Sequence, residues 1–212
     1  MVQAQGPALT TAAFNFELWL RALPVLLIAA SLTWLLSLPL RTVSLVDPLK
    51  SLMLFAAGVL YGLDADPRAP RLAFVLWLLA LWAARQSISL TARGFGKGED
   101  PRYQSLRWTS LYRVFWLQAV AAWIVSLPLL GAFASNAPVG LLDCLGILVW
   151  LAGFVFEAGA WRLTPYPNYY GTLCVWCGFW CMAASAGAWW SAVGPALLML
   201  MANPRLTRRP AP

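Results

Sequence analysis

The stretch LWLRALPVLLIAASLTWLLSLPL, residues 18–40, decides the class of fold. Arg21 is the one charged side chain of this stretch. The stretch is longer than the roughly 20 apolar residues that a helix needs to cross a bilayer. A helix is expected there because it satisfies its own backbone hydrogen bonds where no water can do so. Comparable apolar stretches follow at residues 49–63, 71–90, 111–130, 139–160 and 171–201.

These stretches predict an all-α, polytopic membrane bundle of six or seven transmembrane helices. The stretch 49–63 is short for a span and needs flanking residues or a thinned bilayer. The stretch 171–201 is interrupted near Gly187, which predicts either a helical hairpin or one long kinked span. The expected organisation is an N-terminal segment, a single transmembrane domain and a basic tail, at residues 1–17, 18–201 and 202–212.

The composition of the whole chain indicates lipid as its solvent. Of the 212 residues, 61% are hydrophobic and 11% are charged, whereas a soluble domain has about 25% charged residues. This composition excludes a soluble enzyme, a disordered chain and a small disulfide scaffold. The chain contains no histidine, the commonest general base and metal ligand, and we expect no metal site.

The net charge of +7 indicates membrane topology rather than a nucleic-acid partner, because Lys and Arg gather on the cytoplasmic side of membrane proteins. If the apolar stretches alternate across the bilayer and 171–201 crosses twice, twelve of the 15 Lys and Arg residues fall on one side. Two polar connectors, residues 91–110 and 161–170, lie on that side. We therefore expect a cytoplasmic C-terminus and an outside N-terminus, in a bacterial inner membrane rather than the endoplasmic reticulum.

The first connector contains GFGKGEDPRYQSLR, residues 94–107. Its glycines let backbone N–H groups approach a ligand closely, and its arginines can bind phosphate through two hydrogen bonds. This pattern is compatible with a cradle for an anionic cofactor. A solvated loop whose cations follow the positive-inside rule explains it equally simply.

The second connector and the start of the next apolar stretch read WRLTPYPNYYG, residues 161–171. Two prolines favour an extended turn, and the asparagine and tyrosines supply hydrogen-bonding groups at the membrane surface. The alternative is an aromatic belt, in which Trp and Tyr lie at the level of the lipid headgroups.

Several of these motifs together resemble the steroid 5-alpha-reductase C-terminal domain family of bacterial integral membrane proteins. The resemblance extends from about residue 32 to about residue 201. It implies a multi-helix fold with a cytoplasm-facing pocket, and NADPH-dependent reduction of a carbon–carbon double bond next to a carbonyl in a lipophilic, steroid-like or fatty-enone-like substrate. The motifs are GKGEDPRYQ at 96–104, QAVAAWIVSLPL at 118–129, GFVFE at 153–157, the Trp161, Arg162, Pro167, Asn168, Tyr169 and Gly171 positions, and WWSAVGPALLM at 189–199.

The resemblance also implies a set of site residues. Glu157 and Tyr103 are the candidate proton donors in catalysis. The expected partners are the lipid bilayer and a lipophilic small molecule; the oligomeric state stays open. The candidate NADPH-binding residues are Gly96, Lys97, Glu99, Asp100, Arg102, Tyr103, Arg107, Arg162, Asn168 and Tyr169.

Departures from the family pattern keep two alternatives open. Tyr166 stands where the family has histidine, Thr172 stands where it has glutamate, and a segment that the family carries between residues 160 and 161 is missing. These changes suit a non-catalytic membrane scaffold or lipid-binding descendant of the family. The Pro- and Tyr-containing turn also resembles that of isoprenylcysteine and phospholipid methyltransferases, which use S-adenosylmethionine.

The positions of four other features along the chain support further predictions. Cys174, Cys177 and Cys181 share one helix face, which favours close helix packing over a metal site. Glu157 lies about one turn inside the end of its apolar stretch, where an ionisable group is either functional or interfacial. Asp143 and Arg113 lie at stretch ends, so we expect them to reach toward water.

Overall fold

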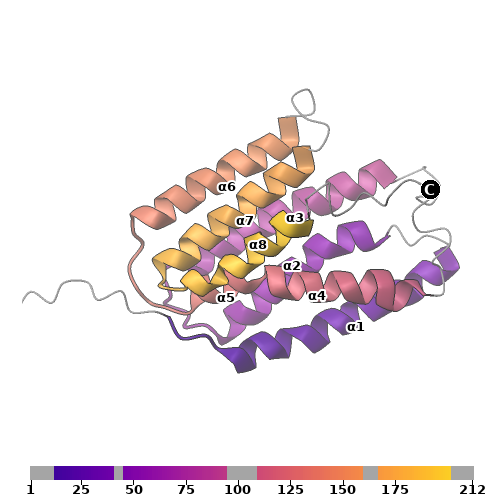
Figure 1. Cartoon of the computed structure of the whole chain (residues 1–212), viewed down its shortest axis with the longest axis horizontal. Helices are drawn as coiled ribbons and strands as arrows, with labels where there is room; N and C mark the ends of the chain where they lie inside the picture. Colours follow the sequence, from indigo (N-terminus) through magenta and orange to yellow (C-terminus); the bar gives the residue numbers. More distant parts are fainter. Residues whose placement is uncertain (1–11, 41–44, 95–108, 160–166, 202–212) are drawn as a thin grey trace, which may run out of the picture.

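The computed structural model describes residues 12–40, 45–94, 109–159 and 167–201. The described residues form helices and no strand, which confirms the predicted all-α class (Figure 1). In chain order the elements are α1 (Phe16–Leu40), α2 (Val46–Asp64), α3 (Leu72–Gly94), the π-helix η3 (Leu111–Trp116), α4 (Leu117–Val125), α5 (Leu127–Phe133), α6 (Leu141–Gly159), α7 (Pro167–Ser185), the 3₁₀ helix η5 (Trp189–Ala192) and α8 (Val193–Met201).

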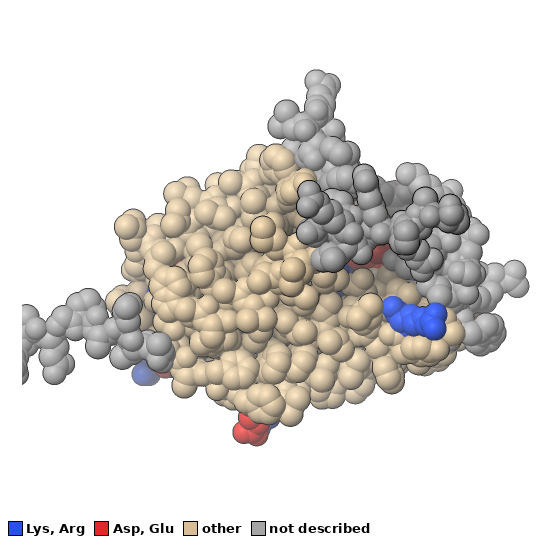
Figure 2. All heavy atoms as spheres, in the orientation of Figure 1, with Lys and Arg blue, Asp and Glu red and all other residues tan. Residues whose placement is uncertain are grey.

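The long helices lie side by side, with α1 and α6 at opposite edges of the bundle (Figure 1). The segment Leu111–Phe133 is central. In its most apolar part 67% of the residues are buried inside the protein, compared with 22–39% for the other four candidate spans. Figure 2 shows that uncharged side chains cover nearly all of the described surface on that side, with charged ones toward its edges or beside the grey atoms. An apolar exterior around a packed interior is what a lipid solvent requires.

The helix termini define two ends of the bundle. At the Arg71 end, α2 ends, α3 and α6 begin, and α7 ends; at the Lys50 end, α2 begins, α3 and α6 end, and α7 begins. Arg71 contacts Asp143 and Ser185, whereas Arg85 and Thr172 contact Glu157, so each end is joined across the same three helices. The alternation of helix direction predicted from the sequence is confirmed for these elements.

Among the described residues, five helices are long and apolar enough to cross a membrane, compared with the six or seven predicted. The remaining stretch is a hairpin, not one long kinked span. The chain reverses at Gly187, whose φ of 89° suits glycine, and the hydroxyl of Tyr169 at the start of α7 donates to the carbonyl of Leu198 near the end of α8. Polar residues in the first turn of α7 lower its hydropathy, and the apolar helix Trp189–Met201 is too short to cross alone.

Two boundaries differ from the predicted connectors. Helix α3 continues to Gly94, and α7 begins at Pro167, so part of each polar stretch is helical. Proline is favoured in the first turn of a helix because its missing N–H has no partner there. The polarity that suggested loops marks helix ends at the membrane surface instead.

Helices α6 and α7 pack unusually closely through glycines. A Cβ atom on Gly153 would lie 2.7 Å from the carbonyl oxygen of Gly171, and one on Gly146 would lie 2.7 Å from that of Gly178. The Cβ atoms of Cys174 and Cys181 border these two contacts, but Cys174 is exposed and Cys177 and Cys181 are half-buried, so the glycines and not the cysteine face form the close contact.

Gly153→Ala should destabilise the fold by about 1–3 kcal/mol, because the new methyl group would overlap a backbone carbonyl that cannot move aside. The matched control is Gly159→Ala on the same helix, where no atom lies within 4 Å of the new carbon. Reversible unfolding in mixed micelles measures both variants. Equal stability of the two would contradict the close contact.

The Arg71 end is held by a fully buried ion pair. Arg71 Nε and Nη2 each donate to a carboxylate oxygen of Asp143 at 2.7 Å, and both side chains are 0% exposed. The guanidinium also donates to the carbonyls of Ala137 and Pro138 and to the hydroxyl of Ser185. The expectation that Asp143 reaches toward water is therefore wrong: its partner lies 72 positions away in sequence, where inspection of one segment cannot find it.

Asp143→Asn should lower the free energy of unfolding by about 3–5 kcal/mol, since it leaves the Arg71 charge buried without its counter-ion. Glu17→Gln, which breaks the exposed Glu17–Arg21 pair, should cost less than about 1 kcal/mol. The same unfolding measurement compares the two variants. Similar losses would show that the buried pair has no special weight.

Candidate functional site

A cavity of about 250 Å³ opens at the Lys50 end of the bundle, between α2, α3, α7 and α8. Its lining contains both polar and apolar side chains. The rings of Trp82 and Trp176 meet edge to face, with centroids 5.7 Å apart. The polar lining consists of Asp47, Lys50, Ser51, Gln86, Tyr169 and Thr172, and the apolar lining of Leu54, Trp82, Leu90, Leu173, Trp176 and Leu198.

The two predicted connectors attach at this end. Helix α3, which leads into the first connector, lines the cavity with Leu90, and α7, which follows the second, lines it with Tyr169. Tyr169 is the predicted cofactor-binding residue whose side chain the structure describes. Its hydroxyl donates a hydrogen bond to the carbonyl of Leu198, and this bond joins α7 to α8 at the edge of the cavity.

Most of the other predicted site residues belong to segments outside the described residues. The side chain of Asn168 is not described, although its backbone belongs to the first turn of α7. The remaining residues lie outside the described part of the chain: Gly96, Lys97, Glu99, Asp100, Arg102, Tyr103, Arg107 and Arg162.

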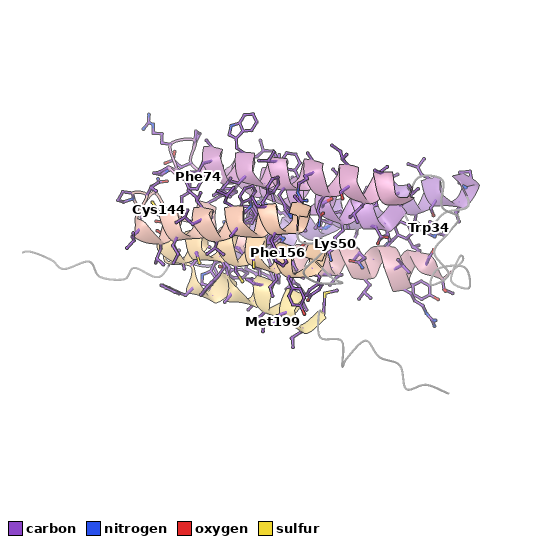
Figure 3. The ribbon with its side chains drawn as sticks, turned by 90° about the horizontal axis from the view of Figure 1, so that it is seen from above. Trp34, Lys50, Phe74, Cys144, Phe156 and Met199 are labelled. Carbon is purple, nitrogen blue, oxygen red and sulfur yellow. The ribbon has the colours of Figure 1, made fainter. Side chains whose placement is uncertain are left out.

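Lys50 supplies a positive charge to the cavity wall. It lies on α2 one turn after Asp47, and it forms no hydrogen bond or ion pair with the described residues other than its electrostatic attraction to Asp47. Figure 3 shows Lys50 among the helices, away from the Arg71 end marked by Cys144 and Phe74. From the sequence, Lys50 counted only toward topology, although a lysine in the first turns of an apolar helix is itself a signal of a functional site.

Glu157 lies behind the cavity wall rather than in it. Its carboxylate is fully buried and pairs with the guanidinium of Arg85, which also lies over the Phe154 ring at 4.7 Å. The hydroxyl of Thr172 donates to Glu157 Oε1 at 2.6 Å, and the indole N–H of Trp82 approaches the same oxygen at 3.4 Å. Thr172 and Trp82 line the cavity and Glu157 does not, so these two side chains lie between its carboxylate and the cavity.

Gln86 extends this network along α3. Its side-chain nitrogen Nε2 donates to Thr172 Oγ1 at 3.3 Å. From the sequence, Thr172 was predicted only to depart from the family pattern, and no role was predicted for Gln86. Neither residue carries a motif, because their role depends on α3 and α7 lying together beside Glu157.

A family model described as "Protein of unknown function (DUF1295)" matches residues 33–160 and 155–204. The matched range includes every described residue that lines the cavity. Comparison with curated proteins and with solved structures gives no match.

Thr172→Val should destabilise the protein by about 1–3 kcal/mol, because it leaves Glu157 one donor short and Gln86 Nε2 without an acceptor. Thr172→Ser keeps the hydroxyl and should lose less than half as much. Unfolding in mixed micelles separates the two variants. Valine and serine variants of equal stability would mean that the hydroxyl contributes nothing.

Proposed function

The chain belongs to the DUF1295 family of steroid 5-alpha-reductase-like membrane proteins, and from this premise we propose that it is a membrane-embedded, NADPH-dependent reductase. Its substrate is a lipophilic molecule with a carbon–carbon double bond next to a carbonyl. The observation that carries the proposal is the cavity of mixed polarity at the Lys50 end, where both predicted cofactor-binding connectors attach.

The cavity fits an amphiphilic substrate by its lining. Leu54, Leu173 and the two indoles offer an apolar surface for a ring or an acyl chain, while Lys50 offers a charge for its polar end. Ligand sites of this kind are mainly apolar, with a few polar groups that fix orientation.

The cofactor fits this site only in part. A cavity of about 250 Å³ lies below the roughly 300–1,000 Å³ of drug-sized ligand pockets, so it holds a fragment and not a whole dinucleotide. Lys50 is the one cation in its described lining, which suits an uncharged ring with its carboxamide and not several phosphates. In the proposal, the phosphates are bound by the residues predicted at 96–107 and by Arg162. NADPH, when bound, supplies the hydride.

Lys50 is assigned to the substrate carbonyl. When a hydride adds to the β-carbon, negative charge moves to the carbonyl oxygen, and an ammonium group there stabilises it. Glu157, paired with Arg85, acts through Thr172 and Trp82 by holding both against the bound substrate. Tyr103 stays the candidate proton donor for the resulting enolate.

The proposal places the Lys50 end in the cytoplasm, where NADPH is available, with the C-terminus on the same side. The charge asymmetry of the sequence supports this orientation, because most Lys and Arg residues belong to the segments at that end. A bacterial inner membrane is the proposed location.

The test is a titration of the detergent-solubilised protein with NADPH, followed by turnover of 3-nonen-2-one and cholest-4-en-3-one. Saturable NADPH binding and NADPH-dependent formation of the saturated ketone are expected. Lipophile binding without NADPH binding would favour the non-catalytic lipid-binding alternative. Binding of S-adenosylmethionine instead of NADPH would favour the methyltransferase alternative.

Lys50→Met should lower kcat for the enone about a hundredfold, with a smaller effect on NADPH affinity, because it removes the charge that stabilises the developing oxyanion. Arg113→Met is the matched control, since Arg113 is an exposed cation of η3 outside the cavity lining. Steady-state kinetics give both parameters. An unchanged kcat in Lys50→Met would remove Lys50 from the reaction.

A further inference from the structure

Gln86 has an acceptor that the protein leaves unused. Its side chain lines the cavity and is 7% exposed, and its amide oxygen Oε1 is buried without a hydrogen-bond partner among the described residues. Buried polar atoms in proteins are nearly always paired, so an unpaired one beside a cavity needs a reason.

The charges of the neighbouring network determine which amide atom is left over. Glu157 is paired with Arg85, and as a carboxylate it only accepts hydrogen bonds. Thr172 therefore gives its single hydroxyl hydrogen to Glu157, and its oxygen is left to accept from Gln86. The reversed amide would set two acceptors against each other, so Nε2 must face Thr172 and Oε1 stays free.

Most donors of the polar lining are already committed elsewhere. The Tyr169 hydroxyl donates a hydrogen bond to the carbonyl of Leu198. The Ser51 hydroxyl lies within hydrogen-bonding distance of the carbonyl of Pro48 and the hydroxyl of Ser87. Trp176 Nε1 is a buried donor of the same lining that also lacks a partner, one helical turn beyond Thr172. Besides the charged groups of Lys50 and Asp47, the cavity lining thus contains one neutral acceptor, Gln86 Oε1, and one neutral donor, Trp176 Nε1, that lack a partner among the described residues.

We infer that Gln86 selects ligands by a neutral hydrogen-bond donor, and that the lipophilic substrate carries a hydroxyl group or an amide N–H. A group that both donates and accepts satisfies Gln86 Oε1 and can also serve Trp176 Nε1. This inference rests on the proposed function for the entry of a lipophilic substrate, and it narrows that substrate from any enone to one with a hydroxyl or amide as well.

The test uses two isomers, decan-1-ol and 1-methoxynonane, which differ in that the alcohol donates a hydrogen bond and the ether does not. Binding to the full-length protein in nanodiscs is followed by the thermal shift at increasing probe concentration. Each probe is compared across variants, which cancels the difference in partition into the bilayer. Gln118→Leu is the matched control, because Gln118 Oε1 is another buried, unpaired acceptor, outside the cavity lining.

Gln86→Leu should weaken apparent binding of decan-1-ol about fivefold, which is the factor expected for one net hydrogen bond. The binding of 1-methoxynonane should stay unchanged. Gln118→Leu should change neither. Unchanged binding of 1-methoxynonane guards against a variant that merely packs badly.

Equal loss of both probes in Gln86→Leu, or no loss of either, would overturn the inference and leave the reductase proposal standing. If Gln86→Leu weakens the binding of nicotinamide and leaves that of decan-1-ol unchanged, Gln86 Oε1 belongs to the cofactor site. This result would also overturn the inference. If neither isomer binds the wild-type protein, the inference fails, whereas the NADPH titration decides the proposed function separately.

Discussion

The buried carboxylate of Glu157 organises the Lys50 end of the bundle. Arg85 neutralises it from α3, Thr172 donates to it from α7, and Trp82 approaches it beside the cavity. A charge in a low-dielectric interior is tolerated only when paired and hydrogen-bonded, so these side chains have little freedom to move independently. The cavity wall is held in place by the same contacts, because two of the three partners, Thr172 and Trp82, line it.

This arrangement depends on how closely α6 and α7 approach. Gly153 and Gly171 bring the two backbones together one turn from Glu157, and Thr172 follows Gly171 directly. Glycine permits the short helix separation, and the short separation places the hydroxyl against the carboxylate. Packing between small residues and the chemistry of the site are therefore one structural feature.

A second buried pair performs a similar structural task at the Arg71 end. Arg71 and Asp143 join α3 to α6, and Ser185 adds α7, so the three helices are tied near both membrane surfaces. The network at this end is completed by backbone carbonyls and lines no part of the cavity. At the Lys50 end, Gln86 Oε1 and Trp176 Nε1 lack a hydrogen-bond partner among the described residues.

Sequence alone determined the helical membrane class, the approximate positions of the apolar helices and the interruption near Gly187, because hydropathy and residue size act locally along the chain. It also singled out Glu157 and, through the family resemblance, a pocket, but it did not identify the partners of Glu157 or most of the side chains that line the cavity. Gln86 and Thr172 carry no motif, and Arg71 and Asp143 lie 72 residues apart. Only the tertiary structure decided which polar groups meet, because pairing in a low-dielectric interior depends on which helices are neighbours.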